Sequence, residues 1–250
     1  MKRQRNSVES SSSREDGASL YSLKCVSNNM EQLDIVFLGA PESGKTSIIR
    51  QFINGTFNTK YTPTKQASLY SSAVVYQNRL YEMNIVDIPS TPFCPSDGLK
   101  KPKLGTPSSN HFSWDDLQAY AAAISRASVL VFVYDITSSE SFQFVTDLRE
   151  QILECFDPDA TTVDLPMMLV AGNKHDLHRF SRLARRHISH MVRKTWKCSY
   201  LECSALFNWH IGSIFHEAVR LVNEGPAREG SNSHYRLPIR AWKHCSCNIL

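Results

Sequence analysis

Hydrophobic residues in this chain follow two alternating patterns. Short apolar or period-two runs predict strands, which we expect at residues 33–38, 67–76, 79–87, 129–135, 167–172 and 200–204. Apolar residues spaced three and four apart predict helices, which we expect at residues 47–53, 114–126, 141–156, 179–197 and 209–222. Strands that alternate with helices in this way favour an α/β fold, a three-layer sandwich around a mostly parallel sheet.

Three segments lie outside this alternation. Residues 1–31 are rich in Ser and charge, and we expect a disordered arm because they cannot bury enough apolar surface. Residues 32–224 are expected to form one domain, in which residues 88–128 make an enlarged connection with five prolines. A connection that long is usually functional or disordered. Residues 225–250 form a basic tail.

Composition narrows the class of protein. With 250 residues, of which 42% are hydrophobic and 21% charged, the chain is no disulfide miniprotein. No run of 18 apolar residues is present, and the first residues lead into serines instead of an apolar stretch. We therefore expect a soluble or merely anchored chain without a secretory signal. The seven cysteines are interpreted as reduced intracellular thiols.

The positive charge is concentrated in two places. Between Leu177 and Leu201 there are seven Lys or Arg residues and no Asp or Glu, and residues 225–250 carry four cations against Glu229. Such an asymmetry suggests a surface that faces an anionic partner, either a membrane or a nucleic acid. For residues 179–197 three interpretations stay open: an ordinary exposed helix face, a membrane or effector surface, and nucleic-acid engagement.

A phosphate-binding loop is predicted where the first strand leads into the first helix. Residues 39–46 fit the pattern G-x-x-x-x-G-K-[ST], in which backbone N–H groups surround phosphate oxygens and the Lys adds a full charge. The candidate binding residues are Gly39, Pro41, Glu42, Ser43, Gly44, Lys45, Thr46 and Ser47. The Thr46 hydroxyl would ligate Mg²⁺, and Asp87 at the end of a later strand is its expected acidic partner.

Base selection is predicted at the end of another strand. Asn173, Lys174, His175 and Asp176 follow the apolar run 167–172. A buried Asp176 carboxylate can accept hydrogen bonds from guanine N1–H and the exocyclic amine, which adenine cannot offer. Asn173 and the stem of Lys174 would brace the loop and cover the ring. We call residues 173–176 the base loop.

Together these motifs resemble those of a Ras-superfamily small GTPase, over about residues 33–224, and most closely those of its atypical Ras-like family member ten subgroup. The resemblance implies the G-domain fold, GTP or GDP with Mg²⁺, effector and regulator proteins as partners, and a monomer. It implies that Ser204 and Ala205, in the sequence Glu202-Cys203-Ser204-Ala205, approach the base together with Phe57. It also implies that residues 61–64 form switch I. Three residues would have catalytic roles: Lys45, Thr64 and Asp87. Three would ligate the metal: Thr46, Thr64 and Asp87.

The departures from the family pattern lead us to expect slow hydrolysis. After Asp87 the family has D-x-x-G and then a glutamine that orients water, whereas this chain has Pro89, Ser90 and Thr91. Thr91 is too short to replace the glutamine, and Ser90 lacks the freedom of glycine. Pro41 and Glu42 are expected to crowd the approach of an arginine finger.

The last four residues predict a lipid anchor. Cys247-Asn248-Ile249-Leu250 fits a C-a-a-X box with a terminal Leu, which indicates geranylgeranylation of Cys247. Cys245 could be palmitoylated as the second signal that one lipid chain requires. We expect the cytoplasmic side of the plasma membrane, with nucleus or nucleolus as the alternative.

The functional hypothesis is a membrane-anchored switch that recruits effectors when GTP is bound. One alternative is a constitutive nucleotide-bound interaction module, which holds nucleotide for stability and presents its basic surface or its long loop to partners. Another is a nuclear GTPase associated with RNA or chromatin. All three hypotheses expect the chain to bind a guanine nucleotide. Nucleic acid is the less favoured partner.

Overall fold

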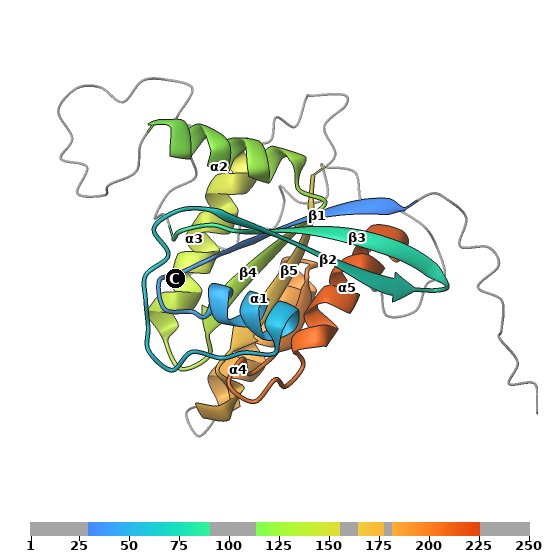
Figure 1. The fold of residues 1–250 in the computed structure, drawn as a ribbon. Helices are drawn as coiled ribbons and strands as arrows, with labels where there is room; N and C mark the ends of the chain where they lie inside the picture. The colour runs from blue at the N-terminus through green and yellow to red at the C-terminus, as the bar shows by residue number, and fades with distance from the viewer. Residues whose placement is uncertain (1–29, 91–113, 156–164, 178–181, 226–250) are drawn as a thin grey trace, which may run out of the picture.

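A six-stranded sheet forms the centre of the domain in a computed structural model, which describes residues 30–90, 114–155, 165–177 and 182–225 (Figure 1). The strands are β1 Glu31–Gly39, β2 Ser68–Tyr76, β3 Arg79–Asp87, β4 Val129–Asp135, β5 Met167–Asn173 and β6 Ser199–Glu202. Their order across the sheet is β2-β3-β1-β4-β5-β6. Only β2 pairs in antiparallel fashion, with β3. The predicted mostly parallel α/β sandwich is confirmed.

Helices cover both faces of this sheet (Figure 1). They are α1 Lys45–Asn54, α2 Trp114–Arg126, α3 Ser139–Cys155, α4 Arg182–His190 with the π-helical turn η3 Met191–Thr195, and α5 Ile211–Glu224. A short 3₁₀ turn, η2, spans His175–Leu177. One core joins α1 and α5 to one face, for example through Ile49 and Phe215. The other joins α2, α3 and η3 to the opposite face, for example through Ile124 and Val192.

The burial of β4 and the turn between β2 and β3 agree with their places in the sheet. β4 is buried along nearly its whole length, as expected for a parallel strand that is covered on both faces. β2 and β3 are joined by a two-residue turn in which Gln77 and Asn78 have φ of 48° and 62°, the conformation that a tight hairpin requires.

Several predicted boundaries were wrong. β1 begins at Glu31, a residue that we had assigned to the disordered arm, because residues 31–33 pair with β3. The expected single helix over 179–197 divides into α4 and η3, and residues 178–181 lie outside the described residues. α5 begins at Ile211 instead of residue 209, because Trp209 pairs with Ser204 in an isolated β-bridge.

The described α4–η3 segment is also less uniformly exposed than an ordinary basic face. Arg185 forms an ion pair with Glu202 at 3.1 Å. Arg193 donates a hydrogen bond to the Tyr200 carbonyl oxygen at 2.8 Å. These two cations therefore hold α4 and η3 against β6, although Arg193, like Arg186 and Lys197, is exposed.

Parts of the predicted organisation lie outside the described residues. These are residues 1–29 of the N-terminal arm, residues 91–113 of the long connection, and the tail from residue 226 with Cys245 and Cys247. The predicted helix 114–126 is confirmed as α2. Within the described parts of the chain, we find no helix of sufficient length and hydrophobicity to span a bilayer.

Candidate functional site

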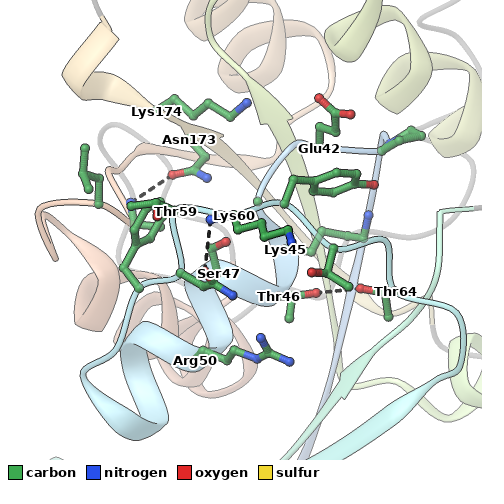
Figure 2. A pocket seen from close by; sticks show the side chains of 18 of the residues that line it. Glu42, Lys45, Thr46, Ser47, Arg50, Thr59, Lys60, Thr64, Asn173 and Lys174 are labelled. Atoms are coloured by element: carbon green, nitrogen blue, oxygen red, sulfur yellow. Dashed lines mark hydrogen bonds between the residues drawn. The ribbon is translucent and has the colours of Figure 1, made fainter.

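A cavity of about 530 Å³ lies at the carboxyl ends of the parallel strands (Figure 2). Ligands of open α/β sheets bind at this edge, and the volume is typical of small-molecule sites. Most predicted site residues line it: Pro41, Glu42, Gly44, Lys45, Thr46, Ser47, Phe57, Thr64, Asn173, Lys174, Asp176 and Ala205. Residues from four separate segments of the chain are thus brought together as the motifs predicted.

The phosphate loop is shaped by its glycines. Gly39 has φ of 142°, and a Cβ there would collide with the Val133 carbonyl oxygen of β4. Gly44 has φ of 92°, and a Cβ there would collide with the side-chain amide of Asn173. Both positions therefore exclude other residues. Glu42 adopts φ of 59°, a left-handed conformation that glycine adopts more readily.

Lys45 is held in the floor of the phosphate loop. Its Nζ donates hydrogen bonds to Gly39 O at 2.9 Å, Ala40 O at 3.1 Å and Ser90 Oγ at 2.5 Å. Burial lowers the pKa of Lys45 to about 8, and the nearby Asp87 carboxylate only partly opposes this shift. The ammonium is therefore a buried cation that lines the cavity at the phosphate loop.

The three predicted metal ligands converge beside Lys45. Thr46 Oγ1 lies 2.9 Å from Thr64 Oγ1 and donates to Asp87 Oδ2 at 2.6 Å, and Figure 2 shows the two threonines facing each other. The other oxygen of Asp87, Oδ1, is buried without a hydrogen-bond partner. Burial raises the pKa of Asp87, although Thr46, Lys45 and Arg50 act in the opposite direction.

On the other side of the cavity, neighbouring residues orient the base loop. Ser204 Oγ donates to Asp176 Oδ1. Lys174 Nζ forms an ion pair with Asp135 at 2.7 Å, so the lysine stem is held across the cavity wall. Burial disfavours the charged form of Asp135, but hydrogen bonds from Lys174 and Thr137 outweigh it and lower the pKa.

Asn173 connects the base loop to two other loops. Its Nδ2 donates to Ser43 O at 2.9 Å, while its Oδ1 accepts from Ala205 N–H at 3.1 Å and from Cys203 Sγ at 3.6 Å. Ala205 is a residue that we expected to approach the base, and its N–H is thus engaged by Asn173. A base contact would have to share this donor.

Trp209 packs beside the base loop. Its ring lies 4.2 Å from the His175 ring and 3.7 Å from the His210 ring, measured between centroids. Asn208 and His210, on either side of Trp209, both have positive φ. This local geometry holds the indole against residue 175 of the base loop.

Four predicted site residues do not line the cavity: Gly39, Ser43, Asp87 and Ser204. Gly39 and Asp87 accept hydrogen bonds from Lys45 and Thr46, which do line it. Ser43 and Ser204 are almost fully buried. We did not assign several residues that line it, among them Arg50, Lys60, Leu177 and Leu206. Arg50 follows Thr46 by one helical turn, and Leu177 and Leu206 directly follow assigned motifs, so spacing could have indicated all three.

Comparison with known proteins agrees with this site. A sequence model of the Ras family matches residues 34–89 and 116–224. Ras-like protein family member 10B of Homo sapiens is 36% identical over 188 residues, which cover 75% of this chain and 84% of that protein.

Two further relatives are similar over a slightly longer stretch. Ras-like protein family member 10A of Mus musculus is 38% identical over 197 residues, which cover 78% of this chain and 89% of that protein. The Homo sapiens protein of the same name is 36% identical over 197 residues, with the same shares covered. The match to the Ras-family model covers all the predicted nucleotide-site residues and every strand, apart from the first three residues of β1.

Proposed function

The chain belongs to the Ras family of GTPases, and from that premise we propose that it is a membrane-anchored switch that recruits effector proteins in its GTP-bound form. Ras-family proteins bind GTP or GDP with Mg²⁺ in general. The observation that carries the proposal is the convergence of Thr46, Thr64 and Asp87 from three separate segments. A hydroxyl of the segment 61–64 therefore lies where a bound nucleotide can order it.

The residues fit a magnesium nucleotide. Mg²⁺ prefers oxygen ligands, and the hydroxyls of Thr46 and Thr64 with the carboxylate of Asp87 supply them. The buried, unpartnered Oδ1 of Asp87 favours a metal-bound water or cation beside it, because an isolated buried acceptor is costly. When bound, Mg²⁺ neutralises charge on the terminal phosphates.

Guanine is the base that we propose. Asp176 lines the cavity and is oriented by Ser204, so its carboxylate can accept the two guanine donors. A site built for such hydrogen bonds rejects a base that lacks them. Competition with ATP against bound fluorescent GDP tests this choice, and displacement by ATP at concentrations similar to GTP would contradict it.

Slow hydrolysis is proposed from the residues that follow Asp87. Ser90 contacts Lys45, and Thr91, which lies outside the described residues, takes the place of the water-orienting glutamine. Single-turnover hydrolysis of GTP should be slower than in a typical Ras protein, and Thr91→Gln should raise the rate. A wild-type rate equal to that of typical Ras proteins would exclude this part of the proposal.

Membrane anchoring through Cys247 is proposed from sequence, at the cytoplasmic side of the plasma membrane. Cys247→Ser should release a fluorescently labelled chain from membranes, because prenylation needs that thiol. Cys245→Ser should weaken membrane retention and leave prenylation intact, because it removes only the second signal. Full membrane retention of the Cys247→Ser variant would contradict the proposed anchor.

The alternative, a constitutive nucleotide-bound module, is favoured by the absent glutamine alone. Amide hydrogen exchange at residues 61–64 and 88–90 distinguishes the two functions. A switch should exchange more slowly at both segments with a non-hydrolysable GTP analogue than with GDP. Equal exchange with both nucleotides would favour the constitutive module.

A further inference from the structure

Three hydrogen-bond acceptors contact the ammonium group of Lys45, one for each of its N–H groups. An ammonium carries three donors, and Lys45 Nζ contacts Gly39 O, Ala40 O and Ser90 Oγ. The Lys45 side chain is buried. A phosphate oxygen that binds Lys45 must therefore share one of these contacts or replace it.

Ser90 is the partner that can adjust. The Gly39 carbonyl belongs to β1, whose register with β4 pairs Gly39 with Val133, and Ala40 directly follows that strand. Ser90 lies three residues beyond the end of β3 and lines the cavity. Its hydroxyl rotates about a single side-chain torsion, whereas the two carbonyl groups are fixed by the backbone.

A serine hydroxyl can bind Lys45 and a phosphate at the same time. It has one donor and two acceptor positions, so an oxygen that accepts from Lys45 keeps its own proton available. Phosphate oxygens are strong acceptors. Because Ser90 Oγ lies within 2.5 Å of Lys45 Nζ, a phosphate group that binds this ammonium comes within reach of the same hydroxyl.

A second hydroxyl from another segment also reaches the start of α1. Thr64, from the segment 61–64, contacts Thr46, the residue that follows Lys45. Ser90, from the segment after β3, contacts Lys45 itself. Two hydroxyls from separate segments thus approach neighbouring residues at the start of α1, where terminal phosphates are expected.

We propose that the Ser90 hydroxyl donates a hydrogen bond to the terminal phosphate of a bound nucleoside triphosphate and thereby helps the protein to distinguish triphosphate from diphosphate. The inference rests on the proposed nucleotide-binding function. The family pattern has a glycine at this position. A glycine has no side chain that could contact the terminal phosphate, whereas Ser90 does.

Affinity measurements on three proteins test the assignment. The dissociation constants of GDP and of a non-hydrolysable GTP analogue are measured with Mg²⁺ by calorimetry for wild type, Ser90→Ala and Ser90→Thr. The Ser90→Ala variant should bind the analogue about tenfold or more weakly than wild type does, because it loses a charge-assisted hydrogen bond. GDP binding should change less than about twofold, and Ser90→Thr, which retains a hydroxyl, should retain most of the preference for the analogue.

A spectroscopic readout separates a direct contact from a structural effect. The ³¹P resonance of the analogue's terminal phosphate should shift in Ser90→Ala and remain near its wild-type position in Ser90→Thr. Thermal unfolding of each nucleotide-free variant shows whether it folds, and Ser125→Ala on the exposed end of α2 serves as the matched control.

Three other outcomes are informative. An equal loss of affinity for GDP and the analogue would overturn the inference and assign Ser90 a structural role at Lys45. A gain in affinity for the analogue would also overturn it, because Ser90 would then compete with the phosphate. If the wild-type protein bound neither nucleotide, the proposed function itself would fail, a result distinct from either of these.

Discussion

The side-chain amide of Asn173 donates a hydrogen bond to the main-chain oxygen of Ser43 at 2.9 Å. Because Ser43 belongs to the phosphate loop and Asn173 to the base loop, one amide joins the two halves of the cavity. The same residue accepts from Ala205 N–H, so it also fixes the loop after β6. Three loops therefore depend on a single buried side chain.

Asn173→Ala should weaken GDP binding about 10- to 100-fold, because the Ser43 oxygen and the Ala205 N–H lose their partner and the loops lose their common register. Displacement of a fluorescent GDP derivative measures this loss. Asn54→Ala, at the exposed end of α1, is the control and should bind as wild type does. An unchanged affinity in Asn173→Ala would show that the backbone alone holds the loops.

Gly44→Ala should abolish detectable nucleotide binding. The new Cβ would collide with the Asn173 amide, and φ of 92° disfavours alanine. The same change at Gly212 meets no atom within 4 Å, and in α5 it should leave binding unchanged and stabilise the fold by up to about 1 kcal/mol. Thermal unfolding and GDP affinity are measured on both variants. Normal binding by Gly44→Ala would contradict the close approach of these loops.

Nucleotide affinity should fall as the pH rises through 8. Burial lowers the pKa of Lys45 to about 8 in the nucleotide-free protein, so the ammonium is charged below that pH and increasingly neutral above it. Since phosphate binding favours the charged form, GDP affinity should fall about tenfold between pH 7 and pH 9. Lys45→Met should bind more weakly and lose this dependence. The same pH dependence in the variant would assign it to another group.

Thr64→Ala should raise the Mg²⁺ concentration that half-saturates the complex with a GTP analogue by about tenfold, because one of three oxygen ligands is lost. Titration of Mg²⁺ against nucleotide release measures the effect. Ser71→Ala, at an exposed position of β2 outside the cavity, is the control and should leave the Mg²⁺ requirement unchanged. Equal requirements in wild type and Thr64→Ala would remove Thr64 from the proposed metal site.

The sequence predicted the parts of the site that are local in the chain. The phosphate loop lies between β1 and α1 because its glycines, its Lys and its helix start are neighbours in sequence. Asp87 and Asn173 were placed correctly at strand ends, because Asp87 closes a run of alternating apolar residues and Asn173 follows a continuous apolar run. The carboxyl ends of parallel strands meet at one edge, so these separate motifs converge.

The remaining features depend on contacts between distant residues. No residue near Ser90 in the sequence indicates its contact with Lys45, which is 45 positions away. The engagement of the Ala205 N–H by Asn173 likewise depends on how β5 and β6 align. The division of the basic helix into α4 and η3 accompanies the burial of Val192 and Trp196 in the core, a packing requirement that overrides the simple helical period.

Trp209 has a practical consequence for studying this protein. Its indole is 38% exposed and lies between two imidazole rings, one of which belongs to the base loop. Trp196, in contrast, is buried behind Arg149 in the opposite core. We therefore expect emission from Trp209 to report on the conformation of the base loop, and variants that keep Trp209 as the sole tryptophan would isolate this signal during nucleotide exchange.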